Sequence, residues 1–267
     1  MTRFPAVAGR FYSADPVALA SEIKGYLHDC PEKTDAMAII SPHAGFIYSG
    51  HVAGAVYSCV EIPDRVIILG PNHTGIGAMG AVMAKGEWAM PMGMTPVDAE
   101  VASAIVERSV PLIPDTSAHM HEHSLEVQLP FLQYINPDIK IVPICLGPFS
   151  LEECVEIGNT IADVVEEQND RTLLVASSDM SHYEPQAQAE RMDGMALEKI
   201  RKMDPAGLWH TVKSAHISMC GIIPVTVAMF AAIRLGATRA DIVKYATSGD
   251  ISGDYSSVVG YAGCIIS

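Results

Sequence analysis

The sequence predicts one α/β domain, with helices on both faces of a mixed or mainly parallel sheet. Continuous apolar runs of strand length alternate along the chain with segments of helical periodicity, which is typical of a sheet covered on both sides. Of the 267 residues, 49% are hydrophobic and only 18% are charged, so the chain can bury a large core. No linker-like or repetitive stretch divides it, and we expect residues 1–267 to form a single domain.

Six apolar runs predict the main strands, because each is rich in Val, Ile, Leu or Ala. They are residues 36–40, 65–69, 139–146, 172–177, 242–247 and 258–266. A further short strand or hairpin is expected around Met79, where small and apolar residues alternate.

Helices are predicted between these runs, and three of them begin with a recognisable cap. Asp15 and Pro16 open a helix that reaches about residue 28, since an N-cap aspartate and a proline at the first position favour a helix start. Asp98 caps a helix to about residue 108, and Asp204 with Pro205 starts another. The remaining predicted helices are residues 49–60, 124–134 with a break at Pro130, 151–167, 185–203 and 219–235.

Charge and composition exclude several classes of protein. The chain has 17 Lys and Arg against 31 Asp and Glu, a net charge of −14, which disfavours nucleic-acid binding and a polybasic membrane surface. No apolar run reaches the roughly 18 residues that a membrane span needs, and no signal-peptide pattern is recognised, so a cytoplasmic protein is expected.

The six cysteines contain no C-x-x-C pair, and the sequence therefore predicts neither a disulfide framework nor a zinc ribbon. Cys59, Cys145 and Cys264 lie in apolar stretches and are expected to be inert thiols in the core.

Three predicted strands run directly into polar segments that carry chemistry. His43 follows the first strand, His73 the second, and Asp179 and His182 follow residues 172–177. In open α/β sheets the ligand site lies outside the carboxyl ends of the strands, so these side chains should converge if the strands are parallel neighbours. The alternative is that each is an ordinary loop residue.

Two imidazoles and a carboxylate form the ligand set of mononuclear non-haem iron sites and of many catalytic zinc sites. Asp179 and His182 can face one cavity if a helical turn begins there. His182 can instead act as a free acid/base group, because imidazole titrates near neutral pH.

A second cluster of histidines precedes the helix expected at residues 124–134. Its simplest interpretation is that His119, His121 and His123 form a solvated loop in which Ser124 caps the helix. A His-x-His pair can also bind metal, but no strand delivers this one. We favour roles in the pocket wall for Glu122 and His123, with Glu126 and Gln128 further behind.

Cys220 lies at the start of the apolar helix expected from residue 219. A helix N-terminus lowers a thiol pKa and favours the thiolate, whereas a buried small apolar residue is the other interpretation. Residues 249–255 form either a pocket loop or a long turn, and Arg10 and Tyr12 of an apolar N-terminal arm are possible neighbours of the site.

Motifs along nearly the whole chain resemble the Memo family, also called AmmeMemoRadiSam system protein B. The matching segments are residues 5–12, 41–50 (SPHAGFIYSG), 70–73 (GPNH), 122–126 (EHSLE) with 128–130, 177–183 (SSDMSHY), 220–221 and 249–253.

The resemblance implies a fold similar to that of class III extradiol dioxygenases, which are non-haem iron enzymes. It implies that His43, His73 and Cys220 hold a metal, with Cys220 standing where the dioxygenases have a glutamate. His182 then corresponds to an acid/base histidine, and Asp179 acts beside it. Further residues expected around the pocket are Asp179, Glu122, His123, Asn72, Tyr183 and Asp250.

The expected function is that of a mononuclear non-haem iron oxygenase or related redox enzyme acting on an unknown small molecule. Fe²⁺ is the expected metal, with Zn²⁺ or Cu as alternatives, because a thiolate suits softer ions as well. A zinc-dependent hydrolase and a non-catalytic metal- or partner-binding protein are the competing functions. The resemblance also implies a functional link to a radical SAM enzyme and an AMMECR-type protein.

Overall fold

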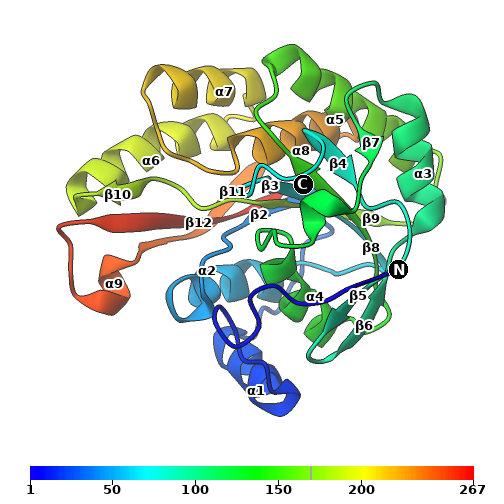
Figure 1. The fold of residues 1–267 in the computed structure, drawn as a ribbon. Coiled ribbons are helices and arrows are strands. Elements are labelled where there is room, and N and C mark those ends of the chain that lie inside the picture. Colours follow the sequence, from blue (N-terminus) through cyan, green and yellow to red (C-terminus); the bar gives the residue numbers. More distant parts are fainter. Residues whose placement is uncertain (169) are drawn as a thin grey trace.

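The structure, a computed structural model, describes residues 1–168 and 170–267, and a mixed sheet of nine strands forms its centre (Figure 1). The order of the strands in the described residues is β10-β12-β2-β9-β3-β8-β4-β7, and β11 pairs with β12. The strands are β2 (Ala38–Ser41), β3 (Arg65–Pro71), β4 (Gly80–Val82), β7 (Ile113–Pro114), β8 (Lys140–Leu146), β9 (Thr172–Ser177), β10 (His182–Glu184), β11 (Ala240–Thr247) and β12 (Val258–Ile266).

The middle of this sheet is parallel, as the sequence predicts. β9 pairs in parallel with β2 on one side and with β3 on the other, and β3 pairs in parallel with β8. The antiparallel strands β12 and β4 flank these four, which makes the sheet mixed.

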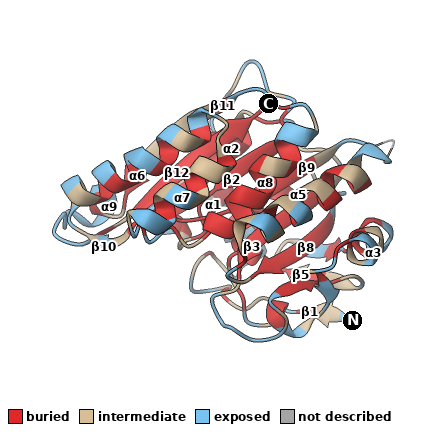
Figure 2. Cartoon of the chain, turned by 90° about the horizontal axis from the view of Figure 1, so that it is seen from above, coloured by how far each residue is buried: buried red, intermediate tan, exposed pale blue. Residues whose placement is uncertain are grey.

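Helices cover both faces of the sheet, which confirms the predicted fold class (Figures 1 and 2). One face carries α5 (Leu151–Glu166), α6 (Gln186–Arg201), α7 (Pro205–Ser214) and α8 (Ile222–Arg234); α3 (Ala99–Arg108) packs on α5. The other face carries α1 (Pro16–Tyr26), α2 (Phe46–Ser58) and α4 (Leu129–Ile135). The predicted caps form: the Asp15, Asp98 and Asp204 carboxylates accept hydrogen bonds from their first turns.

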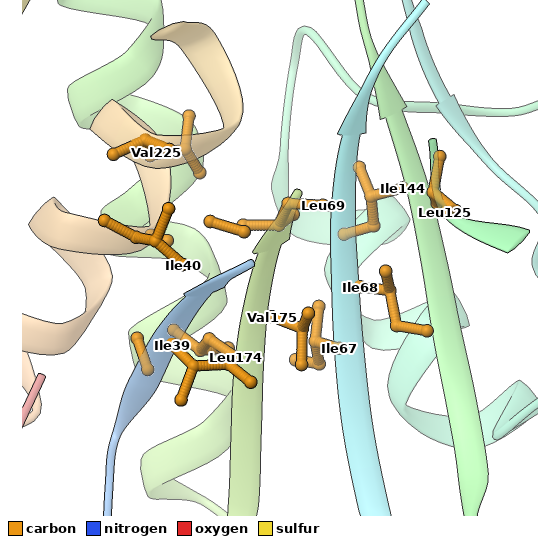
Figure 3. Close-up of a cluster of buried hydrophobic side chains, with 14 of the residues drawn as sticks. Ile39, Ile40, Ile67, Ile68, Leu69, Leu125, Ile144, Leu174, Val175 and Val225 are labelled. Atoms are coloured by element: carbon orange, nitrogen blue, oxygen red, sulfur yellow. The ribbon is translucent and has the colours of Figure 1, made fainter. Parts of the chain in front are cut away.

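The core lies between the helices and the parallel strands. Figure 3 shows Ile67 and Val175 from neighbouring strands beside one another, with Val225 of α8 above β2. These side chains are fully buried. Removing a hydrocarbon side chain of this size from water contributes about 1.5–3 kcal/mol, which explains why apolar runs of this kind become central strands.

Several expectations about local structure are wrong. Cys59 is not a core thiol but forms a disulfide with Cys30, 29 residues away in the sequence. The segment predicted as a helix from Ser124 is a 3₁₀ turn (Glu126–Gln128) followed by α4, and no helical turn begins at Asp179, because residues 182–184 form β10. The Ser124 hydroxyl donates to the carbonyl oxygen of Pro71 instead of capping a helix.

A small second sheet of order β1-β5-β6 was not predicted. It joins β1 (Thr2–Arg3) to the hairpin of β5 (Glu87–Met90) and β6 (Gly93–Pro96). This sheet fixes the start of the N-terminal arm close to the hairpin. The described helices include none with the length and apolar character needed to cross a membrane.

Candidate metal centre

The carboxyl ends of the parallel strands bring the first two predicted histidines together. β2 ends at Ser41 and β3 at Pro71, on either side of β9, so the loops that follow lie along one edge of the sheet. The rings of His43 and His73 are 5.2 Å apart between centroids. The convergence that the strand-end pattern predicts is therefore present for these two residues.

A third imidazole, that of His123, completes the cluster. One nitrogen from each of His43, His73 and His123 can be chosen so that all three atoms lie within 4.8 Å of one another. The sequence places His123 only in the pocket wall, because no strand delivers it. The structure shows that its ring stacks on that of His73 at 4.8 Å between centroids. Phe11 of the N-terminal arm makes an edge contact with the same ring at 5.0 Å between centroids.

Glu122 orients this part of the cluster from a fully buried position. Its carboxylate accepts hydrogen bonds from Nδ1 of His73 (2.9 Å) and from the backbone N–H groups of His73, His123 and Ser124. Burial alone would raise the pKa of Glu122, but the hydrogen bond and charge of His73 and the other donors lower it to about 2. Because a carboxylate can only accept here, Nδ1 of His73 carries a proton, and Nε2 is the nitrogen left for a metal ion.

His43 is oriented by Ser177, the last residue of β9. The Ser177 hydroxyl donates to the carbonyl oxygen of Ser124 and accepts from Nε2 of Gln128, so it is left to accept from Nδ1 of His43 at 2.8 Å. Nε2 of His43 is therefore the unprotonated nitrogen. Burial, followed by the neighbouring histidines, lowers the pKa of His43 well below its usual value, and the ring is neutral at neutral pH.

Cys220 lies directly beside this nitrogen. Its Sγ is 3.2 Å from Nε2 of His43 and accepts a hydrogen bond from the backbone N–H of Asp179 at 3.3 Å. This position requires Gly221 next in the chain, since a Cβ there would lie 2.4 Å from the carbonyl oxygen of Ser177.

The expectation that a helix start makes Cys220 a thiolate is wrong for the protein alone. Burial, and then the negative charge of Asp179, raises the pKa of Cys220 well above its usual value. α8 begins only at Ile222, and the favourable field of its first turn does not offset the loss of water around the sulfur.

Asp179 is buried under the cluster. Its Oδ1 accepts a hydrogen bond from the backbone N–H of His43 at 2.8 Å. Burial raises the pKa of Asp179 to about 6, against the opposing effects of that hydrogen bond and of His182. The carboxyl group thus exchanges its proton close to neutral pH.

His182 lies at the start of β10, half-exposed. Its Nδ1–H donates to the carbonyl oxygen of Ser218 at 3.0 Å, which leaves Nε2 free of that contact. Its charge affects the pKa of both His43 and Asp179, so it belongs to the same electrostatic environment.

The other predicted pocket residues have different positions. Asn72 shapes the turn that carries His73, since its Oδ1 accepts from Gly75 N and its Nδ2 donates to Ile76 O. Tyr183 is 79% exposed beside His182. Asp250 lies in the short helix α9 (Gly249–Ser252), which forms part of the segment expected as a pocket loop or long turn. Its carboxylate accepts a hydrogen bond from the backbone N–H of Thr247, and among the described residues it makes no hydrogen bond with the histidine cluster.

Ser177 was not identified from the sequence as a residue of the site, and the expectation that Tyr12 neighbours the site is wrong. Ser177 ends a predicted strand beside His43, and its place at a shared sheet edge is the signal that could have identified it. Tyr12 is buried and donates to Glu126 rather than to a group of the site.

A cavity of about 270 Å³ opens beside the cluster. Its walls are formed by the loop after β3, the loop after β8, α7 and the start of α8. The lining residues are Pro71, Asn72, His73, Leu146, Gly147, Pro148, Lys213, Cys220, Ile222 and Ile223.

Fold and site together define an α/β protein with three clustered histidines at the carboxyl edge of a mixed sheet. The chain belongs to the Memo family: the family model described as "Memo-like protein" matches residues 3–265.

Curated relatives support the same assignment. MEMO1 family proteins of Methanopyrus kandleri (42% identity) and Methanothermobacter thermautotrophicus (39% identity) are matched over 99% and 98% of this chain, respectively, and over 99% of their own lengths. A crystal structure of an uncharacterised protein from Escherichia coli K12 (JW3007) is similar in fold, with a TM-score of 0.58 at 14% identity, covering 85% of this chain and 98% of that one.

Proposed function

We propose that this chain is a metal-dependent enzyme that binds one divalent transition metal ion and acts on a small molecule, as a non-haem iron oxygenase or related redox enzyme. One observation carries the metal site: one ligand atom from each of His43, His73 and His123 lies within 4.8 Å of the other two, and the Nδ1 atoms of His43 and His73 are hydrogen-bonded. Imidazoles held through one nitrogen, with the other nitrogen left for the ion, fit a divalent metal.

Two residues compete for the third ligand position. A ring nitrogen of His123 lies within 4.8 Å of the ligand nitrogens of His43 and His73, which is close enough to share an ion with them. Sγ of Cys220 lies 3.2 Å from Nε2 of His43. The raised pKa of the Cys220 thiol means that a metal binding there would release its proton.

A bound iron would supply redox chemistry and open coordination positions for substrate and oxygen. The protein's own groups then have defined tasks. Asp179, with its pKa near 6, and His182, with a free Nε2, hold and transfer protons, while Glu122 and Ser177 keep the imidazoles oriented.

A zinc-dependent hydrolase is the second candidate, because three histidines are also the ligand set of some catalytic zinc sites. Copper and a non-catalytic metal-binding role are further alternatives. The resemblance to dioxygenases favours iron over both.

Metal content after anaerobic purification tests this proposal. Iron at about one ion per chain, with oxygen uptake on addition of substrate candidates, supports the redox enzyme, and zinc at the same stoichiometry supports the hydrolase. No metal above the level of His43→Ala would contradict both. His123→Asn and Cys220→Ser then identify the third ligand, and His121→Asn, which changes an exposed histidine of the same loop, is the control.

A further inference from the structure

The cavity beside the histidine cluster contains a single charged side chain that is not part of the cluster. Lys213, in the last turn of α7, is the one acidic or basic residue other than His73 and Cys220 in its lining. The rest of the wall is mainly apolar and includes Leu146, Ile222 and Ile223. The chain has a net charge of −14, yet this cavity is lined by a lysine and by no aspartate or glutamate of the described residues.

Lys213 has no recorded partner within the described residues. Its ammonium group takes part in none of the ion pairs or side-chain hydrogen bonds that the structure defines there. The residue is exposed, and Nζ lies 5.6 Å from the centre of the Trp209 ring, one turn earlier on α7. The charge is therefore available to a ligand.

The acidic groups of the site do not compete for Lys213. Glu122 is occupied by three backbone N–H groups and by His73, and Asp179 by the backbone N–H of His43. Neither carboxylate lines the cavity.

We infer that the substrate is a small organic anion, whose carboxylate or phosphate group binds Lys213 while its apolar part lies against Leu146, Ile222 and Ile223 and its reactive end faces His73 and Cys220. A charge-assisted hydrogen bond from an ammonium group to an oxyanion is roughly twice as strong as a neutral one, so Lys213 selects anions over neutral analogues. A volume of about 270 Å³ limits the ligand to a single small ring or a short chain. The inference deepens the proposed function and rests on it for the identity of the reactive end.

Three probes of similar shape test the inference: benzoate, phenyl phosphate and the neutral benzamide. Binding is measured by isothermal titration calorimetry on the metal-loaded protein and on protein treated with a chelator. We expect at least one anion to bind about tenfold or more tightly than benzamide in both forms, and the preferred anion separates carboxylate from phosphate recognition.

Lys213→Met should remove the preference for the anion, and Lys213→Arg should retain it. Lys24→Met, at the exposed end of α1, is the control and should bind like the parent. Equal binding of all three probes to the parent, or an unchanged anion preference in Lys213→Met, would overturn the inference.

The metal content of Lys213→Met distinguishes the two proposals. We expect it to equal that of the parent, because Lys213 offers no ligand at neutral pH. If the parent binds no metal but still shows a preference for anions that depends on Lys213, the anion site stands and the proposed metal enzyme fails.

Discussion

Glu122 and Glu126 are four residues apart, both fully buried, and their carboxylates bind different side chains. Glu126 is bound by the guanidinium of Arg3, by the backbone N–H groups of Ala6 and Val7, and by the hydroxyl of Tyr12. Arg3 also donates to the carbonyl oxygens of His119 and Glu122. Glu122 instead holds an imidazole whose second nitrogen stays open.

The difference separates a structural polar cluster from a functional one. The Glu126 cluster attaches the N-terminal arm to the domain, and Arg3 also lies over the Trp88 ring at 4.2 Å. The Glu122 cluster holds His73 by one ring nitrogen at the wall of a cavity and leaves the other nitrogen for a ligand. A buried carboxylate thus points to function when its partners keep an open position, and burial alone does not.

The largest expected effect is loss of stability in Glu126→Gln. The substitution leaves the Arg3 charge buried without a counter-charge, and breaking a buried pair in this way costs about 3–5 kcal/mol. Urea unfolding of the metal-free protein measures the change. The double variant Arg3→Met/Glu126→Gln should recover part of the loss, and a loss below about 1 kcal/mol in the single variant would show that the cluster is not structural.

The structural cluster should also respond to acid through His119, whose carbonyl oxygen accepts from Arg3. Burial, reinforced by the charge of Arg3, lowers the pKa of His119 to about 4, from 6.5. The unfolded chain therefore binds the proton more readily, and this contribution to stability is complete above pH 6.5 and is lost as the pH falls toward 4, by about 3 kcal/mol.

His119→Gln isolates this effect, because glutamine retains a donor for the carbonyl oxygen of Ala81 but does not titrate. The free energy of unfolding of the variant, measured from pH 7.5 to pH 4, should fall less steeply than that of the parent. Parallel curves for the two proteins would contradict the assignment.

The functional cluster should respond to Glu122→Gln in metal affinity. The amide no longer fixes the His73 tautomer as a carboxylate does, and loss of such a partner typically lowers metal affinity 10–100-fold, or about 1.4–2.7 kcal/mol. Competition with a chelator measures the affinity, and Glu100→Gln on α3 is the control. If Glu126→Gln lowers metal affinity as much as Glu122→Gln does, the distinction between the two clusters is wrong.

Much of the fold and two of the three histidines could be predicted because their signals are local. Apolar runs identified β3, β8 and β9, and the polar residues after β2 and β3 marked His43 and His73. The strand-end rule then placed them at one edge without any knowledge of tertiary contacts.

The remaining features depend on contacts between distant segments. His123 reaches the cluster because Glu122 and Ser124 bind the loop after β3, and the Cys30–Cys59 disulfide depends on two segments meeting at the end of α2. The protonation of Cys220 reflects burial by surrounding elements, which outweighs a helix start that the sequence does show.

The smallest expected effect concerns strain in the backbone of Tyr183, next to His182 in the functional region. Three described non-glycine residues have positive φ angles: Met203 and His216 follow the C-caps of α6 and α7, where this conformation is usual, but Tyr183 (φ 61°) lies inside β10 at an irregularity of its pairing with β12. Such a backbone costs a non-glycine residue about 1–2 kcal/mol, and the side chain, 79% exposed, recovers little by burial. Tyr183→Gly should relieve the strain, but glycine also adds about 0.5–1 kcal/mol of unfolded-state entropy, so we expect a net change between zero and about 1.5 kcal/mol of stabilisation. Glu184→Gly, at the next residue and without a positive φ, is the matched control and should lose about 1 kcal/mol of stability.

Equal destabilisation of the two variants in urea would show that Tyr183 is not strained. If Tyr183→Gly also leaves metal affinity unchanged, as expected, the strain serves to set the path of β10 next to His182 rather than to hold the metal.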